Sequence, residues 1–167
     1  MSRRRGRVPV RAVVVTDANL APMTDTPGAV TPNAVPMTLA EWRDAARGTL
    51  IERMEIELVH VSADRTAARM PVPHNTQPAG LLHGGASVVL AETLGSVAAS
   101  IHAGPGKAAV GIEVSATHHR GVRSGTVHGE ATALHLGRTT ASYEIVVTDD
   151  AGRRVCTARL TCVILTP

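Results

Sequence analysis

Phenylalanine is absent from this chain of 167 residues, and Trp42 and Tyr143 are its only aromatic residues. Aliphatic side chains and alanine must therefore fill the core, and small side chains allow helices and strands to pack closely. The length fits one domain in which a sheet and a long helix share a single core.

Cysteine is also scarce, with only Cys156 and Cys162 in the chain. The two lie on one predicted strand and share a face, but at about 3.4 Å per residue they are roughly 20 Å apart. A disulfide cannot span that distance. Two buried thiols suit a reducing compartment, so we expect a cytoplasmic protein.

Long apolar runs are missing as well. A membrane-spanning helix needs about 20 apolar residues, and the longest weakly polar run, near 86–101, contains Glu92. The basic start is followed by a short apolar stretch that Arg11 interrupts, which does not indicate secretion. We expect no membrane partner.

The excess positive charge is confined to the first residues. Residues 1–37 hold five arginines against two aspartates, whereas the rest of the chain carries 12 Lys and Arg against 12 Asp and Glu. A neutral folded part does not favour nucleic acid as a partner. Residues 1–37 also lack helical or strand periodicity, so we predict a disordered basic leader followed by one domain over 38–167.

Several chemistries lack their motifs. The chain has no Gly-x-Ser-x-Gly elbow, no phosphate-binding loop and no dinucleotide fingerprint. His118 and His119 are adjacent on a predicted strand and therefore point to opposite faces, which is poor geometry for one metal. We expect neither a metal nor a cofactor.

The periodicity predicts an α+β protein with one antiparallel sheet. Thr38 and Glu41 have the spacing of a capping box, so a short helix should run to about Arg47. Gly104-Pro105-Gly106 should end a second, long helix that is apolar nearly all round and must be covered. The predicted helix and strands after Arg47 are strands 51–60 and 65–72, helix 84–102, and strands 108–118, 125–136, 139–148 and 153–165.

Residues 77–96 carry the chemistry. A loop delivers His83 and Gly84 to the first turn of the long helix, where free N–H groups favour negative charge; two glycines that only allow a tight turn explain this equally well. Glu92 has apolar neighbours in every direction around the helix, and an unpaired carboxylate there is costly. Ser96, one turn on, either orients Glu92 or bonds to its own helix, and Gly95 indicates close approach of another backbone.

Glu92 and Gly84 are too far apart to serve one carbonyl group within one chain. They are eight residues apart, which is about 12 Å along a helix. If they act together, the glycine N–H and the glutamate come from two subunits whose helices lie side by side and antiparallel. This spacing predicts paired sites at a dimer interface.

From about Thr38 to Pro167 the chain resembles the hotdog-fold thioesterases. The string Gln-Pro-x-Gly-Leu-Leu-His-Gly-Gly-Ala-Ser-Val-Val-Leu-Ala-Glu over 77–92 is long and specific, and it is followed by Gly-Ser at 95–96. Shared segments farther on are Gly-Ile-Glu-Val from 111, His-His-Arg at 118–120 and His-Leu-Gly-Arg at 135–138. The resemblance is to the branch of the Arthrobacter-type 4-hydroxybenzoyl-CoA thioesterase, which includes the 1,4-dihydroxy-2-naphthoyl-CoA thioesterase of menaquinone synthesis and the proofreading thioesterase of enterobactin synthesis.

The resemblance implies a long helix wrapped by a six-stranded antiparallel sheet, dimers that pair into a tetramer, and no metal or cofactor. Glu92 would attack the thioester or activate water, and Ser96 would position that water. The Gly84 N–H would polarise the carbonyl, while Gln77 and His83 would orient the thioester. The residues implied for the CoA channel are Gly111, His118, Arg120, Gly121, His135, Leu136, Gly137, Arg138, Thr139 and Thr140.

The resemblance therefore implies hydrolysis of an aromatic acyl-CoA, such as 1,4-dihydroxy-2-naphthoyl-CoA or a benzoyl-CoA-like thioester. Proofreading of thioesters on an aryl carrier protein would use the same residues. A non-catalytic acyl-CoA-binding protein is a further alternative, and a hotdog dehydratase is a weaker one because its motif differs.

Overall fold

The first helix begins at the predicted capping box. In the computed structural model, which describes residues 35–166, the Glu41 N–H donates to Thr38 Oγ1 (3.3 Å) and the Glu41 carboxylate accepts from the Thr38 N–H (2.9 Å). Helix α1 (Leu39–Ala45) follows. Apart from 35–37, the predicted leader lies outside the described residues, and all elements below belong to one compact unit.

The predicted strand over 51–60 is wrong in its first half. Thr49 caps a one-turn helix, α2 (Leu50–Arg53), by accepting from the Ile51 N–H at 3.2 Å. Ile51 and Met54 both pack on the core, and their spacing of three places them on one face of a helix, whereas in a strand they would point to opposite faces. Only from β1 (Glu57–Val61) onward is the chain extended.

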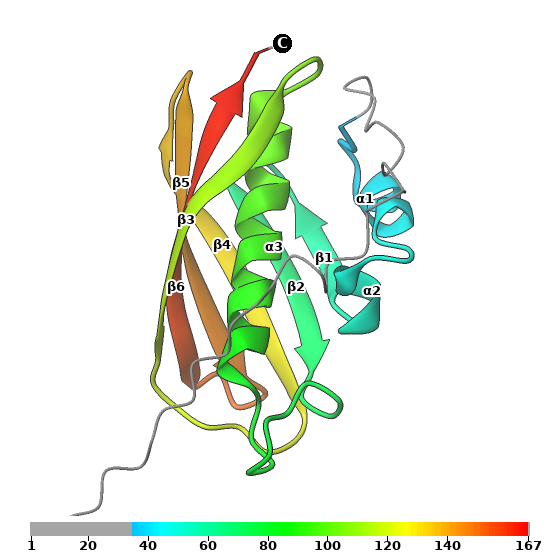
Figure 1. Ribbon diagram of the computed structural model, residues 1–167, viewed down its shortest axis with the longest axis vertical. Coiled ribbons are helices and arrows are strands. Elements are labelled where there is room, and N and C mark those ends of the chain that lie inside the picture. The colour runs from blue at the N-terminus through cyan, green and yellow to red at the C-terminus, as the bar shows by residue number, and fades with distance from the viewer. Residues whose placement is uncertain (1–34, 167) are drawn as a thin grey trace, which may run out of the picture. The chain divides into compact units, whose positions relative to one another are not determined.

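The long helix α3 (Gly84–Ala103) lies at the centre of the fold and confirms the predicted helix over 84–102. The His83 side chain caps its start, and Gly104 ends it with a φ of 76°. By length and composition alone α3 could cross a membrane, but half of its apolar window is buried inside the domain. It is the core helix around which the sheet curls (Figure 1).

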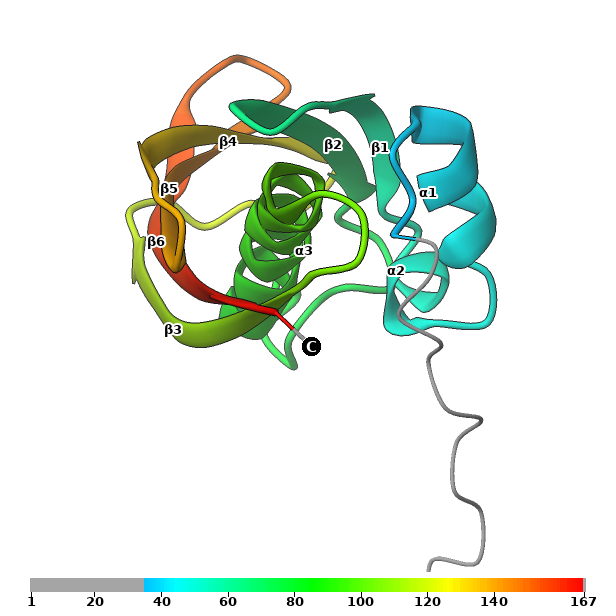
Figure 2. The same ribbon diagram turned by 90° about the horizontal axis from the view of Figure 1, so that it is seen from above.

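One antiparallel six-stranded sheet wraps α3, and its strand order is β1-β2-β4-β5-β6-β3. Seen from above, the sheet curves around α3, and α1 and α2 lie beyond β1 (Figure 2). This confirms the expected hotdog arrangement. The strands after β1 are β2 (Arg65–Pro71), β3 (Ala108–His118), β4 (Thr126–Leu136), β5 (Thr140–Asp149) and β6 (Arg154–Leu165).

Glycines bring α3 close to the sheet. A Cβ on Gly129 of β4 would lie 2.6 Å from Leu94 Cδ1, and a Cβ on Gly95 would lie 2.5 Å from Leu160 Cδ2. The close neighbour of Gly95 is therefore the Leu160 side chain, not another backbone as expected. The rest of the core is small and aliphatic, with Tyr143 as its single fully buried aromatic ring.

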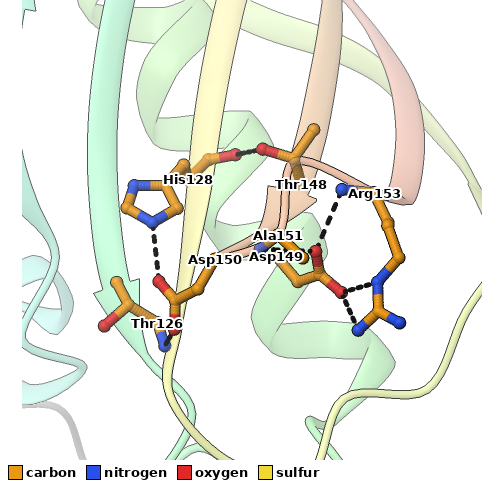
Figure 3. A network of polar contacts seen from close by, with 7 residues as sticks. All are labelled: Thr126, His128, Thr148, Asp149, Asp150, Ala151 and Arg153. Carbon is orange, nitrogen blue, oxygen red and sulfur yellow. Dashed lines mark hydrogen bonds and ion pairs between the residues drawn. The ribbon is translucent and has the colours of Figure 1, made fainter.

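The turn between β5 and β6 is formed by Asp149-Asp-Ala-Gly152, which separates the predicted strands 139–148 and 153–165 (Figure 3). Asp149 accepts from the Arg153 N–H (2.9 Å) and pairs with its guanidinium (2.8 Å), which is the main reason that the pKa of Asp149 lies below its ordinary value. Asp150 accepts from the Thr126 N–H (2.9 Å) and lies 2.9 Å from His128 Nε2. The turn is thereby fixed to β4.

The two edges of the sheet differ. Edge strand β1 is held by α1, whose Arg43 donates to the Leu58 carbonyl at 2.8 Å. Edge strand β3 is exposed in this chain, and Val110, Ile112 and Val114 are its large exposed apolar side chains, with Ile112 62% accessible. An apolar, unpaired edge strand is a template for pairing with another strand.

Candidate active site

Glu92 lies near the middle of α3, half-buried, and lines a pocket. Ser96 is one turn farther along the helix, and its Oγ donates to Glu92 Oε1 at 3.3 Å. The expectation that both share one face of the helix is confirmed. A carboxylate at the border of a pocket can reach a ligand, which a fully enclosed one cannot.

Gly111 of β3 makes room for this carboxylate. A Cβ at that position would lie 2.6 Å from Glu92 Oε1, so any larger residue would displace the acid. The pairing of β3 with β6 shifts register between Gly111 and Glu113, and such a bulge re-aims neighbouring side chains. The resemblance implied a place for Gly111 along the CoA channel, whereas the structure places it against Glu92.

The pocket beside Glu92 has a volume of about 650 Å³. Its walls come from three parts of the chain: the two short N-terminal helices, one face of α3 and strand β3. No Lys or Arg of the described chain lines it, and Glu92 and Glu113 are its only charged residues. Its apolar walls are Trp42, Leu50, Ile51, Val88, Val89, Val97, Ile112 and Val114.

The pocket also contains residues that sequence reasoning missed, among them Trp42, Leu50 and Ile51, which lie outside the recognisable motif. They precede the recognisable motif, and α2 was predicted as part of a strand. One signal was available: Trp42 is the single tryptophan of a chain poor in aromatic residues. Its place next to Glu92 depends on the packing of α1 across β1, which no local pattern reports.

At the start of α3, His83 uses its side chain to cap the helix. Its Nδ1 accepts from the Gly85 N–H at 2.8 Å, so the neutral ring carries its proton on Nε2. Gly84 is the first helical residue, and no carbonyl of the helix can accept from its N–H. The ring of His118 packs on Gly84, where a Cβ would lie 3.0 Å from the imidazole Nε2.

Gln77 lies in the loop before α3. The side-chain Oε1 of Gln77 accepts from the Ala79 N–H at 2.7 Å, and the backbone N–H of Gln77 donates to the Leu81 carbonyl at 2.8 Å. Loop 77–82 packs on the segment after β3, since Leu82 N–H donates to the Val122 carbonyl at 2.7 Å. The amide of Gln77 is thus oriented by its own turn.

The predicted site residues fall at three levels along α3. Gln77, His83, Gly84, His118, Arg120 and Gly121 lie around its N-terminal end. Glu92, Ser96 and Gly111 lie near its middle, about 12 Å farther along at 1.5 Å per residue.

Segment 135–140 lies at the C-terminal end, where His102 Nε2 is 2.8 Å from the Gly137 carbonyl. That end is about 27 Å from Gly84. A single chain does not bring the three groups together. The channel residues implied by the resemblance are therefore split between opposite ends of the helix.

The Glu92 carboxylate affects the pKa of the Cys162 thiol. Cys162 stands opposite Gly111 in the pairing of β3 with β6. Burial first, and the Glu92 carboxylate second, raise the pKa of the Cys162 thiol to about 11. Both cysteines are buried and free, in agreement with the sequence, and residues 35–166 contain no cluster of three His, Cys, Asp or Glu that could hold a metal.

Comparison with known proteins identifies the family. Residues 79–156 match the model of the thioesterase superfamily. The proofreading thioesterase EntH of Cronobacter turicensis is 48% identical over 130 residues, which cover 77% of this chain and 95% of that protein. The chain belongs to the thioesterase superfamily. It is an enzyme that hydrolyses thioesters.

Solved thioesterases share the fold. Thioesterase HI1161 from Haemophilus influenzae superposes with a TM-score of 0.75 at 37% identity, covering 78% of this chain and 92% of that one. A variant of thioesterase PA1618 from Pseudomonas aeruginosa gives a TM-score of 0.72 at 39% identity, with coverage of 77% and 94%.

In this thioesterase, only some of the residues that line the pocket fall within the match to the superfamily model. The matched residues include His83, Glu92 and Gly111, which lie on α3 and β3. The N-terminal wall formed by Trp42 and Ile51 lies before the match begins. The superfamily model therefore covers the candidate acid but not this N-terminal wall.

Proposed function

We propose that this thioesterase removes aromatic acyl groups from the thiol of a carrier, with Glu92 as nucleophile or general base. The similarity to proofreading thioesterases supports acyl groups held on an aryl carrier protein. It does not single out 1,4-dihydroxy-2-naphthoyl-CoA or menaquinone synthesis. Acyl-CoA thioesters carry the same reacting group and serve as test substrates.

This proposal is supported most directly by the contact of Glu92 with Gly111 at the edge of an apolar pocket. A carboxylate so placed can attack the thioester carbonyl or take a proton from the attacking water. If Glu92 attacks, the carbon–sulfur bond breaks as a mixed anhydride forms on Glu92, and water then hydrolyses the anhydride to the free acid. If water attacks, the bond breaks to give the free acid directly; in both routes the sulfur leaves as thiolate and takes up a proton. Ser96 donates a hydrogen bond to Oε1 of Glu92. By orienting the carboxylate, Ser96 also orients the water or the acyl group that the carboxylate contacts.

The site is completed by a second copy of the chain. Gly84 and Glu92 lie about 12 Å apart on one helix, so one N–H and one carboxylate of the same chain cannot flank one carbonyl. Pairing of two exposed β3 edges would set two α3 helices side by side and antiparallel. Gln77, His83 and Gly84 of one copy would then face Glu92 of the other, and two such dimers would form the tetramer.

The same antiparallel pairing narrows the split in the channel. With Gly84 of one copy level with Glu92 of the other, segment 135–140 of the second copy lies about 15 Å along the helix axis from His118 and Arg120 of the first, instead of about 27 Å. Both groups carry side chains or N–H groups suited to a phosphopantetheine or nucleotide phosphate. We further propose that the enzyme is cytoplasmic, that 38–167 forms the catalytic domain and that hydrolysis needs no metal or cofactor.

Glu92→Gln tests the acid. It keeps the shape of the side chain, and it should lower kcat on benzoyl-CoA by about 10² to 10⁴-fold. Glu113→Gln is the matched control, because Glu113 also lines the pocket but pairs with Arg159 at 3.6 Å. Thiol release is measured for both. Glu92→Gln activity within tenfold of wild type would remove Glu92 from the mechanism.

Subunit mixing tests the composite site. Glu92→Ala and the double variant Gln77→Ala with His83→Ala should each be nearly inactive. After co-refolding, random heterodimers would contain one intact site of two, and activity should return to about a quarter of the wild-type value. If subunits exchange and no activity returns, each site is built from one chain.

A further inference from the structure

Trp42 stands in a fixed position on the wall of the Glu92 pocket. Helix α1 is capped at Thr38, and the neighbouring Arg43 donates two hydrogen bonds to the Leu58 carbonyl of β1, at 3.2 and 2.8 Å. The Trp42 ring is half-buried, packs on the core and lines the pocket together with Glu92. A ring held in this way needs little reordering when a ligand arrives.

The indole N–H of Trp42 is buried and has no hydrogen-bond partner among the described residues. An unpaired buried donor costs stability, and a phenylalanine would provide an aromatic ring without that cost. Since water does not reach the N–H, a ligand in the open pocket meets the carbon part of the ring. Trp42 therefore contributes an aromatic surface to the pocket and no hydrogen bond.

No other phenyl, phenol or indole ring is available for this purpose. The chain has no Phe and a single Tyr, and Tyr143 is fully buried with its hydroxyl bonded to the Ala63 carbonyl at 3.0 Å. The remaining walls nearby are aliphatic, from Leu50, Ile51 and Val89. The chain places its one accessible Trp, Tyr or Phe ring in the pocket that the candidate acid also lines.

We propose that Trp42 selects the acyl group by stacking on an uncharged aromatic ring of the substrate. This rests on the proposed function, since it assigns the acyl side of the Glu92 pocket to helices α1 and α2. Offset stacking between aromatic rings adds to the gain from apolar burial, which an aliphatic chain of equal size obtains alone. A carboxylated acyl group is disfavoured, because the lining has two glutamates and neither Lys nor Arg.

The substrate test compares benzoyl-CoA with hexanoyl-CoA for wild type, Trp42→Leu and Trp42→Phe. Wild type should prefer the benzoyl thioester, and Trp42→Leu should lower the ratio of the two kcat/KM values by about tenfold. Trp42→Phe keeps a ring and should retain most of the preference. An unchanged ratio in Trp42→Leu, or a wild-type preference for hexanoyl-CoA, overturns the proposal.

A binding test needs no turnover and no folded Trp42→Leu. Because Trp42 is the only tryptophan, the fluorescence of the Glu92→Gln variant reports on this ring alone. An uncleavable benzoyl-CoA analogue with a methylene between carbonyl and sulfur should quench or shift the emission, and CoA alone should not. Identical spectra with the aryl analogue and with CoA overturn the role of Trp42. Absence of thiol release from every thioester would instead overturn the proposed function.

Discussion

Gly111 and Gly129 give room to α3 on two different sides of the helix. A Cβ on either glycine would lie 2.6 Å from a side-chain atom of α3. At Gly129 that atom is Cδ1 of Leu94, in the buried core; at Gly111 it is Oε1 of Glu92, beside the pocket. A glycine on β4 thus allows α3 to pack closely on the sheet, and a glycine on β3 leaves room for the Glu92 carboxylate of α3.

The difference shows how α3 can be both core and candidate site. Leu90 and Leu94 are completely buried against the sheet, whereas Glu92 and Ser96 are half-buried and face the pocket. Core packing therefore does not depend on the carboxylate. Stability and activity should separate when the two glycines are changed one at a time.

Of the two glycine variants, Gly111→Ala should have the larger effect on activity. The added Cβ meets the far end of a flexible side chain, so Glu92 can move aside at a cost within about 0.5 kcal/mol in the free energy of unfolding. A displaced acid no longer meets the thioester, and a shift of about 1 Å can lower the rate by about 10²-fold. Thiol release and urea unfolding measure the two quantities. Activity within threefold of wild type would show that the contact does not position Glu92.

Gly129→Ala is the matched variant on the core side. Its Cβ would meet Leu94 Cδ1 at 2.6 Å and Leu90 Cδ2 at 3.1 Å, both of which are enclosed. Overpacking of this kind costs about 1 to 3 kcal/mol in the free energy of unfolding. Thiol release per folded molecule should stay close to wild type. A variant that kept its stability and lost activity would reverse the comparison between the two glycines.

The long, regular elements were predictable from the sequence, whereas the pocket was not. Strand 108–118 has the predicted bounds. Helix α3 ends one residue beyond its predicted end at residue 102, because Gly104 stops the helix. The predicted strand 51–60 began too early, because Met54 continues the alternation of Ile56 and Leu58 although Ile51 and Met54 lie on one helical turn. Periodicity decides between helix and strand only over longer segments.

For the candidate site, the sequence located Glu92 and Ser96 on one face because both lie on a single helix. The contact between Glu92 and Gly111 joins elements that meet only after the sheet has closed. The wall at Trp42 has the same origin, since α1 reaches the pocket across β1. Contacts within one helix follow from spacing, and contacts between elements need the fold.

The smallest predicted effect concerns the thiol opposite Gly111. Burial, and second the Glu92 charge, raise the pKa of Cys162 to about 11, whereas burial alone raises the pKa of Cys156. An unfolded thiol has a pKa of about 8.5. The folded chain thus binds the Cys162 proton more tightly, and this part of the stability is complete below pH 8.5 or so and is lost as the pH rises toward 11.

Glu92→Gln removes the charge but not the burial. The pKa of Cys162 should fall toward its ordinary value, so the variant should lose less stability than wild type between pH values of about 8.5 and 10.5. Urea unfolding at several pH values measures that loss. In a Cys162→Ala background, Glu92→Gln should no longer alter the alkaline loss of stability. In a Cys156→Ala background, Glu92→Gln should alter that loss as it does in wild type. Equal alkaline losses in wild type and Glu92→Gln would show that the carboxylate on the pocket side of α3 does not act on the thiol behind Gly111.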